Sequence, residues 1–230
     1  MVMERMTKNI LAIIPARGAS KGIKNKNIVD ISGKPLLAWT IEAALSSKYI
    51  SQTFVSSDNN KILQIAGKHG ASTILRPESL ALDTSASEPT IEHTLQSLSN
   101  ENYEYIILLQ PTSPLRDSSD IDNAFDLFFQ KDATSLISVS KIDKKILKAF
   151  KKNDSGFISA ISNAEYPFMR RQDLPETFIS NGAIYIIKTE EFLKNSSLFT
   201  DRCVSFLMDE IKSIDIDTLE DLNRAQRYLK

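Results

Sequence analysis

The sequence has little cysteine and no long hydrophobic run. Its one cysteine, Cys203, excludes an intrachain disulfide and a cysteine-rich metal site, and so favours a reducing compartment. The apolar stretches have the length of strands, whereas a membrane-spanning helix needs about 20 apolar residues. The opening stretch "MVMERMTKN" contains no apolar run, so we expect no signal peptide. These absences predict a cytoplasmic protein without a membrane partner.

An excess of charge of either sign is also missing. The 28 Lys and Arg residues nearly balance the 29 Asp and Glu residues, which gives a net charge of -1. Proteins that bind nucleic acid usually carry a strongly basic surface, so we expect no nucleic-acid partner, although residues 144–152 form one local lysine cluster. The length of 230 residues and the hydrophobic content of 42% fit one globular domain over residues 1–230.

Apolar periodicity predicts that strands and helices alternate along the first part of the chain. We expect strands over 10–14, 53–57, 72–77, 105–111 and 134–140, and helices over 34–48, 59–70, 87–99 and 118–131. The last of these helices is expected to open on a serine cap. Alternation at this spacing is typical of βαβ units, and it predicts an α/β fold with a parallel sheet covered by helices on both faces.

The alternation lapses between residues 141 and 178. This segment carries eight Lys or Arg against five Asp or Glu, with scattered aromatic residues and no clear period. We interpret 141–178 as an excursion from the sheet that serves as a lid or a dimer arm. A strand over 178–188 and a helix over 217–230 are expected to complete the domain.

A basic loop follows the first predicted strand. Residues 13–28, "IIPARGASKGIKNKNI", contain Arg17, Lys21, Lys24 and Lys26, two glycines and no acidic residue. In open parallel sheets, ligands bind beyond the carboxyl ends of strands, where this loop lies. An arginine fork, lysine ammonium groups and backbone amides beside glycine suit the oxygens of a phosphate chain. The loop matches neither the Walker pattern nor G-x-G-x-x-G, and a solvated basic loop is the alternative interpretation.

Two carboxylates lie near the other end of the chain, in "SIDIDTLEDL". On a strand, alternation would place Asp215 and Asp217 on one face, about 7 Å apart. Ile214 and Ile216 would then face the core. Such a pair can hold one Mg²⁺ together with substrate phosphates. Asp217, three residues before Glu220, is also suited to cap a helix, and this alternative stays open. A cationic loop and an acidic pair together favour metal-dependent nucleotide chemistry.

Five stretches carry a resemblance to a known family. In chain order they read "IIPARGASKGIKNKN", "LRPESLALDTS", "LLQPTSPLR", "FISNGAIYI" and "SIDIDTLEDL". Their order and spacing resemble those of the CMP-N-acylneuraminate synthetases, also called CMP-sialic acid synthetases, from Ile10 to Ala225. The CMP-Kdo synthetases share the "IPAR" opening but lack the Asn-Lys-Asn continuation and the "NGAIY" strand, so they resemble the chain less.

The resemblance implies a three-layer α/β/α domain with a Rossmann-like, mostly parallel sheet of the nucleotide-diphospho-sugar transferase type and a small projecting dimerisation element. It also implies a reaction: CTP and a nine-carbon 2-keto acid sugar, such as N-acetylneuraminate or legionaminate, give the CMP-sugar and pyrophosphate. The implied cofactor is Mg²⁺ or Mn²⁺. The implied assembly is a homodimer in which the excursion of one subunit contributes to the neighbouring site.

Individual residues can be carried over from the matching motifs. The nucleotide-binding positions are Ala16, Arg17, Ser20, Lys21, Lys26, Asn27, Arg76 and Ser87. The sugar-binding positions are Gln110, Lys148, Arg171 and Tyr185, with Arg170 competing for the place of Arg171. Asp215 and Asp217 are implied to hold the metal and, with Arg17 and Lys21, to form the catalytic set.

The implied mechanism is an in-line attack by the anomeric hydroxyl of the sugar on the α-phosphate of CTP. We expect no covalent intermediate and no essential side-chain base, and we interpret His69, His93 and Cys203 as structural. Two alternatives are a catalytically silent nucleotide-sugar sensor on the same fold and a CMP-Kdo synthetase-like enzyme. A degenerate sensor would be expected to lose a loop cation or an acid, yet the sequence retains both groups.

Overall fold

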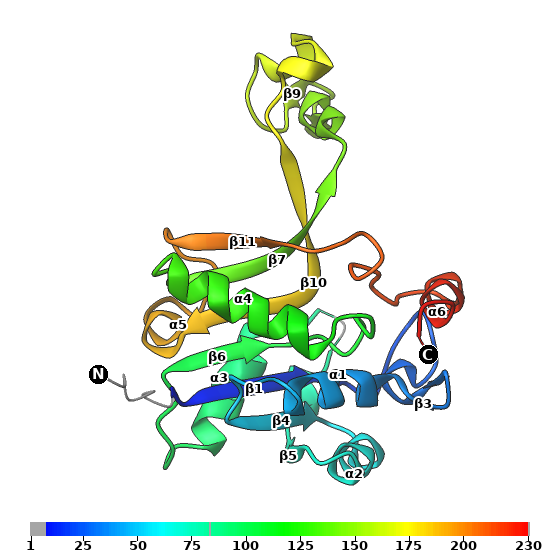
Figure 1. Ribbon diagram of the computed structural model, residues 1–230. Coiled ribbons are helices and arrows are strands. Elements are labelled where there is room, and N and C mark those ends of the chain that lie inside the picture. Colours follow the sequence, from blue (N-terminus) through cyan, green and yellow to red (C-terminus); the bar gives the residue numbers. More distant parts are fainter. Residues whose placement is uncertain (1–7, 83, 230) are drawn as a thin grey trace.

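The computed structural model describes residues 8–82 and 84–229. These residues form a body built on one large sheet, from which a narrow arm projects (Figure 1). None of the helices within these ranges has the length and hydropathy of a membrane span. Residues 1–7, where no signal peptide is expected, lie outside the described residues. So does Lys230, the last residue of the predicted closing helix.

Seven strands form the central sheet, in the order β11-β7-β10-β6-β1-β4-β5. They are β1 (Ile10–Pro15), β4 (Gln52–Ser57), β5 (Ser72–Leu75), β6 (Tyr105–Leu108), β7 (Ser135–Ile142), β10 (Thr177–Lys188) and β11 (Cys203–Leu207). Neighbouring strands are parallel except at β10, which runs antiparallel to both β6 and β7. The prediction of a mostly parallel sheet is therefore confirmed.

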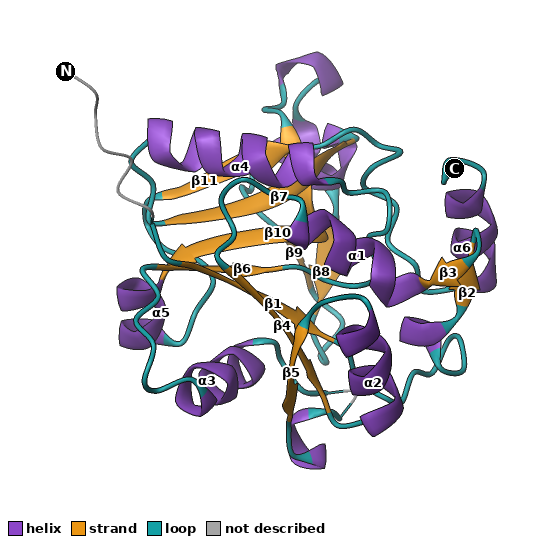
Figure 2. Cartoon of the chain, turned by 60° about the horizontal axis from the view of Figure 1, so that its bottom comes forward, coloured by secondary structure: helices purple, strands orange, loops and turns teal. Residues whose placement is uncertain are grey.

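Helices cover both faces of this sheet. They are α1 (Leu36–Leu45), α2 (Asn60–Lys68), α3 (Glu88–Ser97), α4 (Ser118–Gln130), α5 (Thr189–Asn195) and α6 (Leu219–Gln226). Figure 2 shows α1, α2 and α4 on one face, and α3 and α5 on the other. Because side chains of a strand alternate, Ile10, Ala12 and Ile14 of β1 pack in one core, and Leu11 and Ile13 pack in the other. The chain thus has the expected three layers.

A third apolar cluster joins segments that lie far apart in the sequence. It contains Ile23 of the basic loop, Ile214 and Ile216 of the acidic stretch, and Leu222 of α6, all of them buried. The short strands β2 (Asp30–Ile31) and β3 (Lys34–Pro35) form an antiparallel pair just before α1, and β2 contributes the buried Ile31 to this cluster. This cluster fixes the start and the end of the domain against each other, on the side where the site lies.

Several sequence predictions need correction at the level of single elements. The cap of α4 is Asp117, not a serine: its carboxylate accepts from Asp120 N at 3.1 Å, and the Asp120 carboxylate accepts from Asp117 N at 3.0 Å. A charged acceptor at a helix N-terminus is favoured by the helix dipole. Strand β11 and helix α5 were not predicted, because both are short and none of the five β11 residues is fully buried. The closing helix spans eight residues rather than the whole of 217–230.

The excursion over 141–178 is the projecting arm. Its base is formed by the outer ends of β7 and β10, which pair at Thr177↔Ile142. Its outer part holds β8 (Phe150–Lys152), β9 (Ile158–Ala160) and three short 3-10 helices, η3 (Lys144–Lys148), η4 (Tyr166–Phe168) and η5 (Arg171–Asp173). Large apolar side chains of the arm are exposed to solvent, among them Phe157 and Phe168 at 74% and 84%. Such exposure is unusual in a monomer.

Candidate active site

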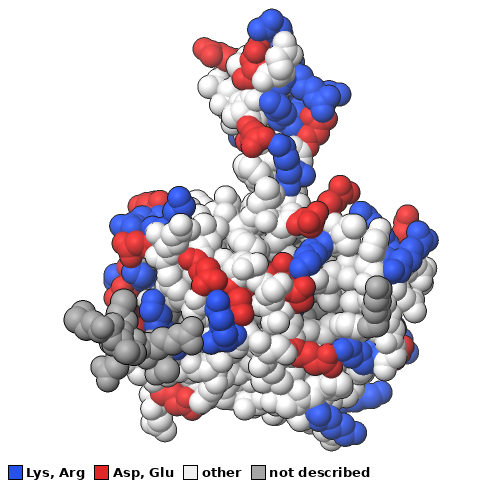
Figure 3. All heavy atoms as spheres, viewed as in Figure 1, with Lys and Arg blue, Asp and Glu red and all other residues white. Residues whose placement is uncertain are grey.

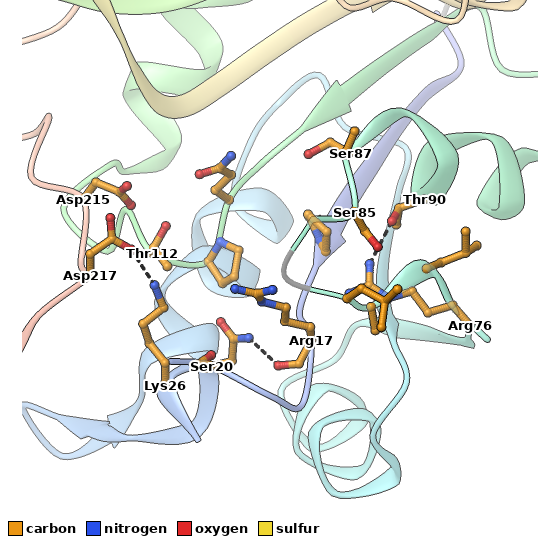
Figure 4. A pocket seen from close by; sticks show the side chains of 18 residues that line it. Arg17, Ser20, Lys26, Arg76, Ser85, Ser87, Thr90, Thr112, Asp215 and Asp217 are labelled. Carbon is orange, nitrogen blue, oxygen red and sulfur yellow. Dashed lines mark hydrogen bonds and ion pairs between the residues drawn. The ribbon is translucent and has the colours of Figure 1, made fainter. Parts of the chain in front are cut away.

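A cleft of about 250 Å³ opens at the carboxyl ends of β1 and β6. It is lined by Pro15, Arg17, Ser20, Lys26, Asn27, Arg76, Leu80, Ala81, Leu82, Ser85, Ala86, Ser87, Thr90, Gln110, Pro111, Thr112, Asp215 and Asp217. Figure 4 shows the acidic pair at one end of this cleft, Arg17 in its middle and Arg76 at the other end. Loops that follow β1, β5 and β6 thus meet residues from near the end of the chain, as expected for an open α/β sheet.

The basic loop is folded onto the edge of the sheet by its own polar groups. Asn27 is buried, and its Nδ2 donates to the carbonyl oxygen of Arg17 at 2.9 Å. The amide of Gly18 donates to Asp58 Oδ1 at 2.9 Å. Asn25 adopts the left-handed conformation, with φ 56, and begins the short helix η1 (Lys26–Ile28). This turn directs Lys26 towards the cleft, whereas Lys21 is exposed and does not line it.

The basic loop and the acidic stretch are in direct contact. Lys26 Nζ donates to Asp217 Oδ1 and to the carbonyl oxygen of Ile216, both at 2.8 Å. A Cβ atom at Gly22 would lie 2.2 Å from the carbonyl oxygen of Asp217. Glycine is therefore required here because two backbones approach each other more closely than a side chain allows.

The acidic pair is not on a strand, and this part of the sequence prediction is wrong. Residues 214–217 belong to no helix or strand, although Ile214 and Ile216 are buried between the more exposed aspartates as alternation predicts. The extended backbone preserves the alternation, but it does not pair with a strand of the sheet. Ile216 N donates instead to the carbonyl oxygen of Thr112 at 2.9 Å. The alternative role as a helix cap is not taken by Asp217, because Thr218 caps α6.

The surroundings of Asp215 suit a hard cation. Burial and the nearby Asp217 raise the pKa of Asp215, while a hydrogen bond from Thr112 and the charge of Lys26 oppose the rise. Its Oδ1 is buried and has no hydrogen-bond partner among the described residues. Within the same residues, no group of three or more His, Cys, Asp or Glu side chains is placed to bind a metal. Two carboxylates that leave further positions to phosphate oxygens form the kind of site that Mg²⁺ prefers.

Arg76 forms the other end of the cleft. It is 5% exposed, and its Nη1 donates to Thr90 Oγ1 at 2.9 Å. Burial lowers the pKa of Arg76, the charge of Asp58 opposes this shift, and the neighbouring Arg17 adds to it. Its Nε is buried and makes no hydrogen bond to the described residues. A guanidinium held in this way has a donor left for a ligand in the cleft.

The structure brings together nine of the predicted site residues and leaves five outside the cleft. The nine are Arg17, Ser20, Lys26, Asn27, Arg76, Ser87, Gln110, Asp215 and Asp217. Outside it are Lys21 on the loop surface, Ala16 beneath the loop, Tyr185 on β10, and Lys148 and Arg171 on the arm. Lys148 donates to the carbonyl oxygen of Pro167, and Arg171 pairs with Asp143 at 3.3 Å. The arm residues therefore do not reach the cleft of their own chain.

Sequence reasoning missed several residues that line the cleft. Thr90 and Thr112 contact Arg76 and Asp215, respectively, and the loop 80–82 closes one side. Thr112 lies within "LLQPTSPLR", one of the stretches that carry the family resemblance. The sequence therefore marked this stretch, but it did not show which residue Thr112 contacts. The partner of Thr112 lies about a hundred positions along the chain, and no local pattern reveals such a contact.

This combination of fold and site defines a nucleotidyltransferase: a mostly parallel α/β sheet, a cationic loop after the first strand, and an acidic pair facing it across one cleft. Residues 11–229 match the protein family described as Cytidylyltransferase, and the chain belongs to this family. The match confirms the class predicted from the five sequence motifs.

Relatives of similar sequence support the same family. The chain is 37% identical over 221 residues to an N-acylneuraminate cytidylyltransferase of Escherichia coli O18:K1:H7, covering 96% of this chain and 52% of the relative. It is 32% identical to a pseudaminic acid cytidylyltransferase of Campylobacter jejuni and 35% identical to a CMP-N,N'-diacetyllegionaminic acid synthase of Legionella pneumophila, covering 96% of each chain. The chain thus spans about half the length of the E. coli relative and nearly all of the other two. These names confirm the resemblance to the CMP-sialic acid synthetase group.

A solved structure supports the fold independently. A CMP:2-keto-3-deoxy-manno-octonic acid synthetase complexed with CTP superposes with a TM-score of 0.72 at 16% identity, covering 96% of this chain and 98% of the other. At this level of identity the likeness concerns the fold, and it confirms the three-layer arrangement.

Proposed function

We propose that the chain is a cytidylyltransferase that transfers the CMP group of CTP to a sialic-acid-type nonulosonate and releases pyrophosphate. The observation that supports this most is the meeting of Arg17 and Lys26 with Asp215 and Asp217 in one cleft. Phosphate-binding cations and cation-binding acids are the two groups that nucleotidyl transfer requires. The names of the relatives provide the class of acceptor sugar.

The cationic side of the cleft would bind the triphosphate. Arg17 presents a planar fork, Lys26 adds a compact charge, and Ser20 lines the cleft between them. The buried Asn27 holds the Arg17 backbone and so fixes the start of the loop. We assign the end of the cleft near Arg76 and Ser87 to the nucleoside, because among the described residues this end is lined by polar donors and by no acid.

Asp215 and Asp217 would hold Mg²⁺ or Mn²⁺. The unpartnered Oδ1 of Asp215 and the proximity of two carboxylates fit a hard divalent cation. Such an ion, when bound, neutralises phosphate charge and lowers the pKa of a nearby hydroxyl. Lys26 already balances the charge of Asp217, and it would then lie between the acidic pair and the phosphates.

The reaction depends more on how the protein positions the two substrates than on a nucleophile or base supplied by a side chain. A bond forms between the anomeric oxygen of the sugar and the α-phosphorus, the bond from that phosphorus to the leaving pyrophosphate breaks, and the hydroxyl proton passes to solvent. His69, His93 and Cys203 do not line the cleft, in keeping with the structural roles expected for them. Arg17 and Lys26 would stabilise the charge that develops on the transferred group.

The test is pyrophosphate release from CTP with a panel of acceptors. We expect Mg²⁺-dependent release with at least one of N-acetylneuraminate, pseudaminate and N,N'-diacetyllegionaminate, and little release with UTP in place of CTP. Release with Kdo alone would favour the CMP-Kdo synthetase alternative. CTP binding without release for any acceptor would favour the sensor alternative.

A substitution at Gly182 can test binding of the acceptor sugar separately from binding of CTP. It has φ +76, and a Cβ atom there would lie 2.8 Å from Gln110 Oε1. Gly182→Ala is therefore expected to displace the Gln110 side chain and to raise the KM for the sugar by about tenfold, while the KM for CTP stays within about twofold. Steady-state kinetics with each substrate varied in turn measures the difference.

Gly33→Ala is the matched control for this prediction. Gly33 has φ +88, so alanine meets the same backbone strain, but no contacting atom of the described residues lies within 4 Å of the added Cβ. We expect both variants to lose stability and only Gly182→Ala to change the KM for the sugar. An equal change in both variants would show that strain, not the contact with Gln110, is responsible.

We also propose that the arm joins two copies of the chain. Its exposed apolar side chains need a partner surface, and Figure 3 shows Lys and Arg side chains gathered along one side of it. In a dimer whose arm reaches the cleft of the partner, Lys148 and Arg171 would lie near the carboxylate of the sugar, as the resemblance implies. A neighbouring subunit is needed because the arm projects from the body of its own chain (Figure 1) and none of its residues lines the cleft.

Mixing two inactive variants tests this arrangement. Arg171→Ala and Asp217→Asn are each expected to be inactive, and a mixture of them should recover about a quarter of wild-type activity. In such a mixture half of the dimers are mixed, and each mixed dimer has one complete site of two. Light scattering should give the mass of a dimer. A dimer without recovered activity would contradict the sharing of sites, and a monomer would contradict the dimer itself.

A further inference from the structure

The acidic segment, residues 213–217, has no regular structure to hold it in place. A strand or a helix would fix the aspartates through its own hydrogen bonds, but this segment lies outside the sheet. Its middle and end are held by the buried Ile214 and Ile216, by the bond from Ile216 N to the Thr112 carbonyl, and by the contact with Lys26. At its beginning, Ser213 N donates to the carbonyl oxygen of Asp209, and Ser213 Oγ accepts a hydrogen bond from Asn181 Nδ2 at 2.9 Å. Any further attachment at this beginning adds to the precision with which both aspartates are placed.

Lys212 lies immediately before this segment and is bound to helix α4. Its Nζ donates to Asp117 Oδ2 at 2.8 Å, to Asp120 Oδ2 at 2.8 Å and to Asp120 Oδ1 at 2.9 Å. All three ammonium donors of the lysine therefore have carboxylate partners. A lysine held by three charge-assisted bonds is far less mobile than one in an ordinary surface pair.

The two carboxylates are themselves fixed. Asp117 and Asp120 form the reciprocal capping box of α4, so neither can turn away without unpairing a backbone amide. The Asp120 side chain is 11% exposed, which shields its pair with Lys212 from water and salt. The adjacent Arg116 is buried, and burial lowers its pKa. The negative charges of Asp120 and Asp117 oppose this shift, because they stabilise the charged guanidinium.

The loop before α4 touches the acidic segment at a second place. Thr112 receives the bond from Ile216 N and donates to the Asp215 carboxylate. Residues 112–120 therefore hold the acidic segment at both ends, through Lys212 at its beginning and through Thr112 near its end. Between these two attachments the backbone carries both aspartates.

We propose that Lys212 is a positioning residue that fixes Asp215 and Asp217 for cation binding by tying the start of the acidic segment to helix α4. Lys212 does not line the cleft and would touch neither substrate. It acts on the cation through the placement of the carboxylates, as outer partners of metal ligands do. This inference rests on the proposed function, because it takes the acidic pair as the cation site.

Direct binding of Mn²⁺, followed by electron paramagnetic resonance in the presence of CTP, is the main readout. Lys212→Met keeps an unbranched side chain, one atom shorter, and removes the charge, and it is expected to weaken Mn²⁺ binding by about tenfold. Binding of CTP without metal should stay within about twofold, because the basic loop and Arg76 are untouched. Lys212→Arg should restore Mn²⁺ binding, since a guanidinium can reach the same two carboxylates.

Two further variants separate positioning from general stability. Lys194→Met breaks an exposed lysine–glutamate pair of similar length, 2.7 Å, on α5 and should leave Mn²⁺ binding unchanged. Asp120→Asn keeps an acceptor for the helix cap but removes the charge that binds Lys212. It should therefore weaken Mn²⁺ binding, as Lys212→Met does. Asp120→Asn also keeps the inference testable if Lys212→Met does not fold.

The outcomes distinguish this inference from the proposed function. Wild-type Mn²⁺ affinity in both Lys212→Met and Asp120→Asn would overturn the positioning role. An equal loss of metal-free CTP binding and Mn²⁺ binding would also overturn it, because that pattern indicates a general loss of structure. If instead the wild-type protein bound Mn²⁺ with CTP but released no pyrophosphate with any acceptor, the proposed function would fail and the role of Lys212 would stand.

Discussion

Asp217→Asn is expected to lower turnover by at least about 10²–10³-fold, the size of effect seen when one charge-stabilising group is removed from a transition state. The substitution leaves a side chain of the same shape that can still accept a bond from Lys26, but it removes the charge that a divalent cation requires. The cleft and the fold should be retained. Pyrophosphate release at saturating CTP and sugar, measured over a range of Mg²⁺ concentrations, gives the effect.

Glu220→Gln is the control for the loss of one negative charge. Glu220 is an exposed residue in the first turn of α6 and does not line the cleft. Its substitution should leave turnover within about twofold, as for a surface charge away from the site. Near-normal, magnesium-dependent turnover of Asp217→Asn would show that the cation site has been assigned to the wrong residues.

Gly22→Ala is expected to lower activity by about 10²-fold through a displacement of the acidic segment. The added Cβ would lie 2.2 Å from the Asp217 carbonyl oxygen, so the two backbones must separate by about 1 Å to reach an ordinary contact. A misplacement of about 1 Å can cost about 10² in rate. The atom that must move is in the backbone, and no side-chain rotation relieves the contact. Turnover and the Mg²⁺ concentration for half-activation should both change.

Gly67→Ala is the control for this substitution. Gly67 is inside α2, and outside the helix backbone an added Cβ meets no atom of the described chain within 4 Å. Alanine favours the helix by about 1 kcal/mol relative to glycine, so this variant should be as active as the wild type and at least as stable. If Gly22→Ala behaved like Gly67→Ala in both assays, the close contact between the basic loop and the acidic segment would not govern activity.

The fold was predictable from sequence where burial on both faces leaves a continuous apolar run. Strands β1 and β6 are such runs, and both occur where the pattern predicted them. Strand β11 was missed because it lies at the edge of the sheet and pairs with β7 alone among the described strands. Its alternating pattern is short and none of its five residues is fully buried, so the local signal is weak and the tertiary pairing decides its structure.

The site was predictable as a set of residue types, but not in its geometry. The basic loop contains several lysines of equal chemistry, and the left-handed turn at Asn25 makes Lys26 rather than Lys21 line the cleft. The alternation of Asp215 and Ile216 was read correctly as an extended backbone but wrongly as a strand. Whether an extended segment finds a neighbouring strand depends on contacts far along the chain, which periodicity does not encode.

Lys26 and Asp217 are 191 positions apart, and their ion pair closes a loop that contains nearly the whole domain. During synthesis the basic loop leaves the ribosome long before the carboxylates that complete the cleft, because Asp217 follows Lys26 by 191 positions. We expect contacts of such high sequence separation to form late, because the residues between the two segments must be ordered before the segments can meet. Recovery of activity on refolding should therefore trail recovery of helical content, so catalysis itself reports when the polypeptide has reached its final topology.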